Sequence, residues 1–367
     1  MKYTLPFYYE ATEKNDNGGF PKSFPFEVRL DETLGMFRQI PSKELKEILK
    51  SAYWKGSMLT GGMNDAIIGN ARVDSAIDFI KKNFNLNKNI KILEIGCGEG
   101  QIIQKLSALG IQCVGLEPAP VEGIENENLK MVRDFFPSKK IKDKFDLILH
   151  FGVMEHINDP VNFLIEQQKL LTDEGEIICA IPDCEEDLKN GDISLFLHEH
   201  FNYFTKYNIA NVAKSANLFL VKTEKSIAGG LFFAKLTKQS TNLTKISNPL
   251  LEDGFITEME KFNQAVIKFV KNSRQEDLAV YCPLRAMNMF YLAGISSCRL
   301  VDDNLNMHNK YLPTFQNPIE SFEQLKKNPP KKLLIYSKTF DKIIKEKCLD
   351  SIELQNTEIK AITDLID

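Results

Sequence analysis

Three glycines separated by single residues stand at the end of an apolar segment of the chain. The stretch reads KILEIGCGEG, and its glycines are Gly96, Gly98 and Gly100. Because glycine lacks a Cβ, the backbone of such a loop can approach a ligand closely, as in sites for dinucleotides and for S-adenosylmethionine. Dinucleotide loops follow the pattern GxGxxG, whereas Gln101 stands where their third glycine belongs. The loop by itself leaves both cofactors open.

Two acidic side chains next to the loop separate these alternatives. Glu94 precedes Gly96 by two residues and lies on the strand beneath the loop. A pyrophosphate would gain nothing from a carboxylate in that place, whereas a sulfonium or ammonium group would be attracted to it. Glu117 ends the next apolar segment, VGLE, and can accept hydrogen bonds from two ribose hydroxyls. These acids favour S-adenosylmethionine.

The following apolar segments extend the predicted cofactor site. Asp134 comes after KMVR and is placed to accept a hydrogen bond from an adenine amino group, with Phe135 against the ring. The segment FDLILHFG then supplies a fourth strand, which ends below the cofactor. We therefore expect the cofactor to contact Glu94, Gly96, Cys97, Gly98, Gly100, Glu117, Pro118, Asp134, Phe135, His150 and Gly152.

Histidines are concentrated in the same part of the chain. Four of the five are His150, His156, His198 and His200, and the last two lie in LFLHEHFNYFT, after the fifth predicted strand. In an extended segment, the rings of His198 and His200 would lie on one face, above the carboxyl edge of the sheet. Histidine titrates near neutral pH and so suits a general base. Packing at the strand end is the alternative for His150, and a capping or supporting role is the alternative for His156.

A metal site is the competing interpretation of the His-x-His spacing. Imidazole nitrogens at that spacing are typical zinc ligands. No matching cluster of carboxylates or cysteines occurs nearby in the sequence, and the chain has no CxxC motif. We therefore expect the protein to work without a metal.

Strand and helix signals alternate along most of the chain. Residues 64–84 carry apolar positions at helical spacing, and IKILEIG, QCVGLE, KMVRDF, FDLILHFG and GEIICAIP read as strands between helices. Strands joined by helices predict a parallel sheet. LFLVKTEKS and LFFAKLTK lie close together and predict an antiparallel pair at one edge of that sheet. A second alternating set begins at EDLAVYC and predicts a smaller α/β unit.

These signals divide the chain into four predicted segments. Aromatic residues in SAYWKGSMLTG, Trp54 among them, could cover the substrate, although packing in a core is the more common use of such residues. The segments are an N-terminal extension or lid over residues 1–63 with a helix at 42–53, an α/β domain over 64–240, a linker and helix over 241–276, and a small α/β domain over 277–367.

The order of these motifs resembles a known enzyme family. LEIGCGEG, LEP, RDF and FDLILHFGVMEHI follow one another as in class I S-adenosylmethionine-dependent methyltransferases. The resemblance implies a Rossmann-like domain with a mostly parallel, seven-stranded sheet and S-adenosyl-L-methionine as the cofactor. MEHI followed by HEHFNYFT is similar to nucleotide-sugar C-methyltransferases, which methylate a ring carbon beside a ketone. On that resemblance His200 is the proposed base, Glu199 is its neighbour, and His156 is a further pocket histidine. The His-x-His spacing adds His198 as a catalytic candidate that would mainly position the substrate.

The resemblance extends into the second α/β unit but has three departures. LVDDNLNMHNKYLP is similar to the C-terminal unit of the sugar enzymes, so the likeness covers roughly residues 85–350. The chain lacks their N-terminal cysteine-rich zinc-binding module. Leu197 stands where they carry a pocket tyrosine, and CPLRAM stands where their C-terminal unit has a glycine-rich turn.

Composition excludes several other classes of protein. The 367 residues are 43% hydrophobic with a net charge of −4, and no basic stripe suggests nucleic-acid binding. No apolar run is long enough for a membrane helix, and the N-terminus shows no secretory signal, so we expect a cytoplasmic protein. The seven scattered cysteines favour buried free thiols over disulfides.

The sequence therefore predicts methyl transfer to a sugar or sugar-derived acceptor in surface-glycan or deoxysugar biosynthesis, with a histidine base. C-methylation of a keto sugar and O-methylation of a hydroxyl or phosphate-type oxygen both remain open. A scaffold that kept a methyltransferase fold without turnover is the remaining alternative. The predicted partner is a small-molecule or nucleotide-linked sugar, without nucleic acid or membrane.

Overall fold

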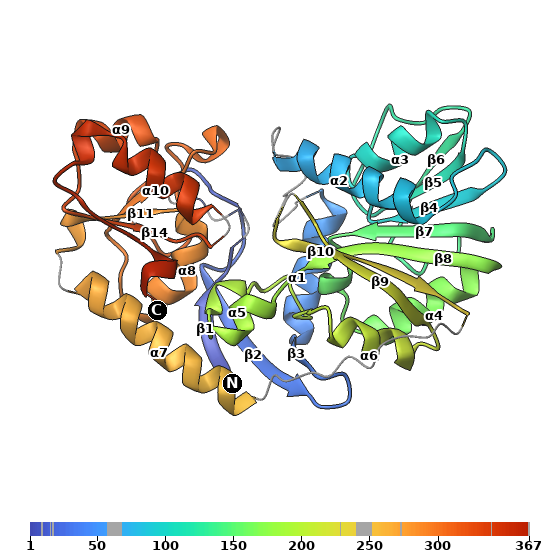
Figure 1. The fold of residues 1–367 in the computed structure, drawn as a ribbon, viewed down its shortest axis with the longest axis horizontal. Coiled ribbons are helices and arrows are strands. Elements are labelled where there is room, and N and C mark those ends of the chain that lie inside the picture. Colours follow the sequence, from blue (N-terminus) through green and yellow to red (C-terminus); the bar gives the residue numbers. More distant parts are fainter. Residues whose placement is uncertain are drawn as a thin grey trace. The chain divides into compact units, whose positions relative to one another are not determined.

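The computed structural model describes residues 1–8, 10–14, 16, 18–56, 68–227, 229–239, 252–271, 274–338 and 340–365 (Figure 1). Part of the predicted lid segment, the start of the helix predicted at 64–84 and most of the linker before residue 252 lie outside these residues. The domain boundaries expected at residues 63, 240 and 276 stay predictions. Contacts group the chain into a large unit, Val28–Glu185 with Glu199–Pro249, and a small unit, Met1–Glu27 with Glu186–His198 and Leu250–Asp367.

A seven-stranded sheet forms the centre of the large unit. Its strand order is β6-β5-β4-β7-β8-β10-β9. Strands β4 to β8 pair in parallel, whereas β10 pairs antiparallel with both β8 and β9. This arrangement confirms the predicted Rossmann-like sheet and the antiparallel pair at its edge. The strands are β4 (Lys91–Ile95), β5 (Gln112–Glu117), β6 (Leu129–Arg133), β7 (Phe145–Phe151), β8 (Leu171–Pro182), β9 (Phe219–Lys225) and β10 (Leu231–Thr237).

Side-chain caps mark where two helices of the large unit begin. The Ser42 side chain accepts a hydrogen bond from the N–H of Leu45 at 3.0 Å, and the Asp159 side chain accepts one from the N–H of Asn162 at 2.9 Å. Such caps each stabilise a helix by about 1 kcal/mol. The helices are α1 (Lys43–Trp54), α2 (Ile68–Asn83), α3 (Gln101–Ser107), α4 (Pro160–Leu170) and α6 (Asn208–Ser215), with a short 3-10 turn η1 (Met154–His156) after β7.

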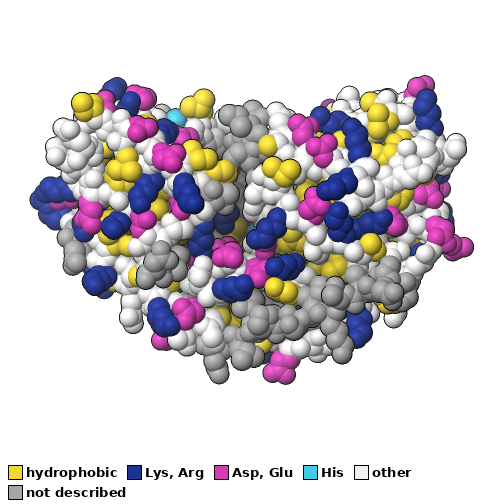
Figure 2. Space-filling view, in the orientation of Figure 1, with side chains coloured by type: hydrophobic (Ala, Val, Ile, Leu, Met, Phe, Trp, Pro, Cys, Tyr) yellow, Lys and Arg dark blue, Asp and Glu magenta, His cyan; other side chains and the backbone are white. Residues whose placement is uncertain are grey.

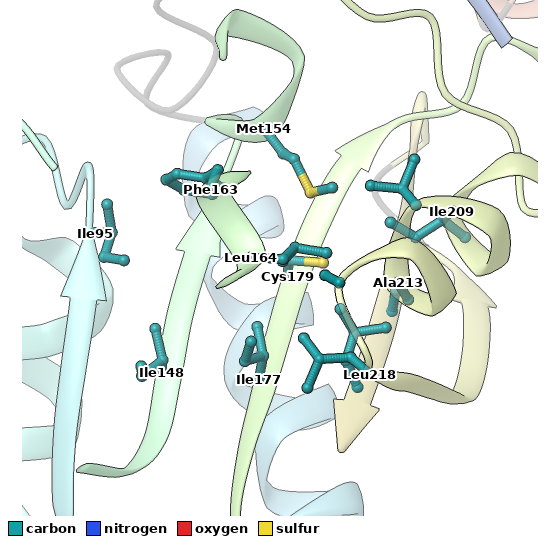
Figure 3. Close-up of a cluster of buried hydrophobic side chains, with 14 of the residues drawn as sticks. Ile95, Ile148, Met154, Phe163, Leu164, Ile177, Cys179, Ile209, Ala213 and Leu218 are labelled. Carbon is teal, nitrogen blue, oxygen red and sulfur yellow. The ribbon is translucent and has the colours of Figure 1, made fainter. Parts of the chain in front are cut away.

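The sheet lies between two layers of helices. On one face, Ile148 and Ile177 pack with Phe163 of α4 and with residues of α6 (Figure 3). On the other face, their sequence neighbours Leu147 and Ile178 join a second cluster with residues of α2 and α3. Because successive side chains of a strand point to opposite faces, a continuous apolar strand can serve both layers. The result is a three-layer α/β sandwich, which leaves the carboxyl ends of the strands available for a ligand.

Three strands precede the first helix, where the sequence shows only weak periodicity. β1 (Lys2–Pro6) pairs antiparallel with the first half of β2 (Ser23–Asp31), within the small unit. The second half of β2 pairs antiparallel with β3 (Met36–Gln39), within the large unit. The N-terminal segment therefore contributes strands to both units.

A second parallel sheet forms the core of the small unit. Its five strands have the order β13-β12-β11-β14-β15, which confirms the predicted second α/β unit. Ala279, Val301 and Ile335 of the sheet pack with Leu325 and Ile344 of two helices. The elements are β11 (Leu278–Tyr281), β12 (Arg299–Val301), β13 (Ile319–Glu320), β14 (Lys332–Ile335), β15 (Glu358–Ala361), α7 (Glu252–Lys271), α8 (Pro283–Leu292), α9 (Phe322–Lys327) and α10 (Asp341–Leu349), and α5 (Glu185–Lys189) lies at the boundary of the units.

The surface and the thiols agree with the composition. Lys and Arg side chains are interspersed with Asp and Glu on the face drawn in Figure 2. All seven cysteines are free, and all except Cys282 are buried. Within the described parts of the chain, no helix is both long enough and apolar enough to cross a membrane.

Candidate active site

The glycine loop connects β4 to α3 and is held against β5. The N–H of Gly96 donates a hydrogen bond to the carbonyl of Leu116 at 2.8 Å. Gly96, Gly98 and Gly100 have φ angles of 67°, 53° and 76°, which residues with a side chain rarely adopt. A Cβ built on Gly96 would lie 2.6 Å from Cγ2 of Val153. The loop therefore requires glycine for its own geometry, in addition to any ligand.

Glu94 lies beneath this loop, and its side chain is almost completely buried. Its Oε2 atom has no hydrogen-bond partner among the described residues. Burial raises the pKa of this carboxyl group to about 8, while the N–H of Ile103 lowers the pKa and the charge of Glu117 raises it. Leaving a buried carboxylate oxygen without a partner is costly, and a ligand's ammonium group would satisfy it. The residue thus fits the amino group of S-adenosylmethionine.

Glu117, at the end of β5, holds the loop with both of its carboxylate oxygens. Oε2 accepts a hydrogen bond from the N–H of Gly98 at 2.9 Å, and Oε1 accepts one from the N–H of Ala119 at 3.0 Å. Burial raises the pKa of Glu117, and these two N–H groups lower it. Each carboxylate oxygen has a second lone pair, so ribose hydroxyls can still donate to it. The ribose contact stays a prediction, and the structure adds a positioning role.

Asp134 and Phe135 follow β6 and lie beside an aromatic residue of α1. Asp134 accepts hydrogen bonds from the hydroxyl of Ser138 at 2.8 Å and from the N–H of Phe135 at 2.9 Å, which lower its pKa although burial opposes them. The Phe135 ring stacks on Trp54 with centroids 5.9 Å apart, and the guanidinium of Arg133 lies 4.4 Å from the Trp54 ring. Because Trp54 is 42% exposed, it does not belong to a core. It extends the surface on which we expect the adenine to lie.

The remaining predicted cofactor residues differ in their surroundings. Cys97 is buried in the loop, Pro118 accepts a hydrogen bond from Arg133 through its carbonyl at 3.2 Å, and Gly152 follows β7 with a φ of 66°. His150 is fully buried, with its ring 5.2 Å from that of Phe163 in the core. Neither ring nitrogen of His150 has a hydrogen-bond partner among the described residues, and burial lowers its pKa to about 3. This packing agrees with the structural alternative for His150, while a cofactor contact stays a prediction.

A cluster of titratable side chains lies where η1 meets residues 199–202. Nδ1 of His156 lies 2.9 Å from the carbonyl oxygen of Glu199 and 3.2 Å from the hydroxyl of Tyr53. That hydroxyl also donates to Oε2 of Glu199 at 3.4 Å. The rings of His156 and His200 are 4.9 Å apart. The structure thus brings together three of the predicted catalytic residues and adds Tyr53 from α1.

Burial sets the protonation states in this cluster. It lowers the pKa of His156 to about 4, although the carbonyls of Glu199 and Gly152 oppose that change. It raises the pKa of Glu155 to about 8, and the charge of Glu199 contributes to the rise. The pKa of Tyr53 is raised for the same reasons, with burial the largest. His156 is therefore uncharged at neutral pH. Within the described part of the chain, Glu155, His156 and His200 form a group whose side-chain geometry could hold a cation.

His198 lies elsewhere, and the expected arrangement of the two histidines is wrong. Residues 198–199 form a turn rather than an extended segment, and His198 belongs to the small unit. Its Nε2 pairs with the carbonyl of Phe24 at 3.0 Å, and its ring packs 5.2 Å from Phe7 and 5.3 Å from Phe26. Burial lowers its pKa to about 4. These contacts are those of a core histidine, so the rings of His198 and His200 do not share one face.

The sequence between α2 and β9 matches a known family. A model described as a methyltransferase domain matches residues 70–223, which include the glycine loop and the cluster around His156. This part of the chain is therefore similar to methyltransferase domains.

Curated relatives of the methyltransferase domain are named as O-methyltransferases of ubiquinone biosynthesis. A ubiquinone biosynthesis O-methyltransferase of Pelagibacter ubique (strain HTCC1062) is 36% identical over 102 residues, which are 25% of this chain and 42% of that protein. The protein of the same name from Ruegeria sp. (strain TM1040) is 32% identical over 100 residues, 25% of this chain and 40% of that one. The chain thus spans about two fifths of the length of these relatives.

Solved structures similar to the methyltransferase domain are more distant in sequence. A Burkholderia thailandensis 1,6-didemethyltoxoflavin-N1-methyltransferase, solved with S-adenosylhomocysteine, has a TM-score of 0.42 at 15% identity and covers 58% of this chain and 100% of its own. CalO1, a methyltransferase in calicheamicin biosynthesis solved with S-adenosylhomocysteine, has a TM-score of 0.38 at 14% identity and covers 47% of this chain and 56% of its own. Likeness at this level gives no information about the acceptor.

The methyltransferase domain also uses residues that the sequence did not identify. Glu155 stands next to His156 in MEHI, so its position alone could have marked it. Tyr53 is 103 residues from His156 and 146 residues from Glu199, and no spacing rule connects them. Ser138, which binds Asp134, carries no recognisable signal in the sequence.

Proposed function

We propose that the protein transfers the methyl group of S-adenosylmethionine to a sugar or sugar-derived acceptor in surface-glycan or deoxysugar biosynthesis. The observation that carries this proposal is the cluster of His156, Glu199 and His200 beyond the end of β7, next to the glycine loop beyond β4. Both lie at the carboxyl edge of one sheet, where α/β proteins bind their ligands.

Two close approaches support the placement of the cluster beside the cofactor. A Cβ on Gly96 would lie 2.6 Å from Val153, three residues before His156. A Cβ on Gly56, just after α1, would lie 3.6 Å from Pro120, which follows Glu117 closely. The cofactor loops, the cluster and the end of α1 are therefore neighbours in the large unit.

The cluster supplies what methyl transfer asks of a protein. The methyl group of a sulfonium is already activated, so the acceptor needs only to be held in line with it and to lose a proton. We propose that His200 removes this proton, as the sequence resemblance implies. His156 and Glu199 would orient the acceptor. Tyr53 brings a phenol to the cluster, which compensates for Leu197 at the position where the sugar enzymes carry a tyrosine.

Two observations bear on the type of acceptor atom, and they favour different answers. The sequence around Glu199 and His200 resembles that of nucleotide-sugar C-methyltransferases, and this resemblance favours a carbon beside a ketone. The curated relatives are named as O-methyltransferases, which favours an oxygen. We place carbon first, because the resemblance to the sugar enzymes extends into the small unit and includes the cluster itself.

Methyl transfer from labelled S-adenosylmethionine tests this function. The purified chain would be offered a nucleotide-linked keto sugar, the same sugar with its ketone reduced, and a catechol. We expect label on the keto sugar and none on the reduced sugar or the catechol. Label found only on the catechol or on the reduced sugar would show that the acceptor atom is an oxygen and would contradict the proposed C-methylation.

The cofactor-site variant Glu117→Ala serves as the control for contaminating activity in this assay. Cofactor binding without transfer to any of the three acceptors would favour the scaffold alternative. We further propose a small-molecule partner without nucleic acid, a methyltransferase domain over residues 64–240 and a separate domain over 277–367. Limited proteolysis that leaves these two segments intact would support the division.

A further inference from the structure

Three side chains of the large unit form a compact set of metal-ligand atoms. One oxygen of Glu155 and one ring nitrogen each of His156 and His200 all lie within 4.8 Å of one another. Oε1 of Glu155 lies 3.8 Å from Nε2 of His156. The expectation of no metal rested on the lack of a carboxylate near the His-x-His pair. In the structure that reason no longer holds. The neighbours of His200 are Glu155 and His156, and Glu155 supplies the missing carboxylate.

A hydrogen bond favours the tautomer of His156 that a cation would need. Nδ1 lies 2.9 Å from the carbonyl oxygen of Glu199, and a carbonyl oxygen can only accept. With the proton of the neutral ring on Nδ1, the lone pair of Nε2, which lies 3.8 Å from Oε1 of Glu155, is left for a cation. Histidines that bind metals are commonly held in this way, by a carbonyl or carboxylate on the other nitrogen.

The two segments that carry the ligands are tied together by backbone and side-chain hydrogen bonds. The carbonyl of Glu155 accepts from the N–H of Phe201 at 2.7 Å and from that of Asn202 at 3.1 Å. The Asn202 amide donates to the carbonyls of Met154 at 3.1 Å and Ile157 at 2.7 Å. These bonds hold the backbone on either side of the ligand residues, so a cation would need to order little of the chain when it binds.

The charge balance of the cluster favours a cation. Glu155 and Glu199 are each 3% exposed. Glu155 forms no ion pair with Lys or Arg within the described residues, and its Oε2 atom has no hydrogen-bond partner there. A buried carboxyl group keeps its charge only beside a partner of opposite charge or a metal, and otherwise takes up a proton.

We propose that Glu155, His156 and His200 bind a divalent transition-metal cation of the zinc type. Two imidazoles and one carboxylate suit zinc better than magnesium, which prefers oxygen ligands. Three protein ligands leave at least one coordination position open. The inference rests on the proposed function in one respect: the open position would bind the oxygen of the acceptor and make the acceptor's proton more acidic. His200 would then act as a ligand, and the proton would pass to the carboxylate of Glu199, whose Oε2 lies 3.9 Å from Nδ1 of His156.

Metal binding to the untagged full-length chain tests the site without any turnover. The chain would be stripped with a chelator and titrated with zinc alone, and then with cobalt(II), whose visible spectrum distinguishes histidine and carboxylate ligands from the thiolates of the cysteines. We expect one equivalent of zinc per chain and a cobalt spectrum without thiolate charge-transfer bands. Removing even an outer partner of a ligand costs 10–100-fold in affinity, so Glu155→Gln and His200→Ala should each lose at least about 100-fold.

His308→Ala is the matched control, because His308 is a histidine of the small unit that pairs with the carbonyl of Asp302. It should bind zinc as the unchanged chain does. Unchanged S-adenosylmethionine affinity in the Glu155 and His200 variants shows that the fold persists. No zinc binding by the unchanged chain, equal binding by these variants, or a thiolate spectrum would each overturn the site. Failure to find an acceptor would bear on the proposed function and not on this result.

Discussion

At the scale of single residues, the two buried glutamates under the glycine loop have different roles. Glu117 uses both oxygens to hold the N–H groups of Gly98 and Ala119. Glu94 keeps one oxygen without a partner among the described residues and has a pKa raised to about 8. Glu117 thus positions the loop, and the contact of Glu94 with a positively charged ligand stays a prediction.

Glu94 should make the stability of the cofactor-free protein depend on pH. Its pKa is raised in the folded state, so its contribution is complete below about pH 4.5 and is lost as the pH rises through about 8. The free energy of unfolding should fall over this range by at most about 5 kcal/mol on account of Glu94. In Glu94→Gln, urea unfolding at several pH values should show a smaller fall, though Glu155 preserves part of it.

The control for Glu94→Gln is Glu99→Gln, which removes the same charge from an exposed position of the loop. That variant should keep the pH dependence of the unchanged protein. Equal slopes for Glu94→Gln and Glu99→Gln would show that Glu94 is not buried in its folded environment.

His150 should make the free energy of unfolding fall at acidic pH, in contrast to Glu94, whose effect appears as the pH rises. Its pKa is lowered to about 3 by burial, so its contribution is present above about pH 6.5 and is lost as the pH falls toward 3. His150→Leu keeps an apolar side chain against Phe163, and it should unfold at lower pH than the unchanged protein. Acid titration followed by circular dichroism measures this. An unchanged acid midpoint would contradict the burial of the ring, and weaker cofactor binding would support the contact predicted from the sequence.

At the scale of elements, the glycine loop and the loop that carries Val153 constrain each other. Gly96→Ala should strain the backbone and force a Cβ against Val153, whereas Gly123→Ala, with a similar φ of 74°, has no atom within 4 Å of the new Cβ. The backbone cost is about 1–2 kcal/mol for either variant, and the clash should add about 1–3 kcal/mol for Gly96→Ala alone. Urea unfolding compares them.

A second change isolates the contact with Val153. Adding Val153→Ala to Gly96→Ala should recover part of the lost stability, because it removes the atom that the new Cβ would meet. If Gly96→Ala proves no worse than Gly123→Ala, the two loops do not pack as described.

Helix α1 should serve both halves of the site through neighbouring residues. Tyr53 contacts His156 and Glu199, and Trp54 stacks on Phe135. Tyr53→Phe should therefore lower methyl transfer about tenfold with unchanged cofactor affinity, as expected for losing one hydrogen bond. Trp54→Ala should instead weaken S-adenosylmethionine binding by roughly 1 kcal/mol. Calorimetry and the transfer assay separate the two, and the same effect from both variants would contradict this division.

The elements also show what could be predicted from the sequence. The parallel sheet and the glycine loop were accessible, because apolar strands alternate with helices and because Gly96, Gly98 and Gly100 follow a strand directly. The position of His198 could not be predicted. Side chains two residues apart lie on one face only where the chain is extended, and residues 198–199 form a turn. The contact between Tyr53 and His156 depends on packing across 103 residues, which local patterns do not encode.

At the scale of the whole molecule, the cofactor site and the cluster belong to the large unit, and the small unit repeats the α/β pattern without that loop. Its first turn, after β11, has Cys282 in the left-handed conformation at φ 60°. A side chain at such a position restricts close approach of a ligand to the backbone. The small unit therefore offers no glycine-rich cofactor loop at this turn.

The central claim is that binding of S-adenosylmethionine depends on the residues after β4 and β5, while chemistry depends on the cluster after β7. Calorimetric titration of S-adenosylmethionine into the unchanged chain, Glu117→Ala and His200→Ala tests this most directly, since it needs no acceptor. We predict that Glu117→Ala weakens binding by roughly 2–4 kcal/mol, as for losing a buried charged acceptor, and that His200→Ala binds as the unchanged chain does. Unchanged affinity in Glu117→Ala, or a comparable loss in His200→Ala, would contradict the account.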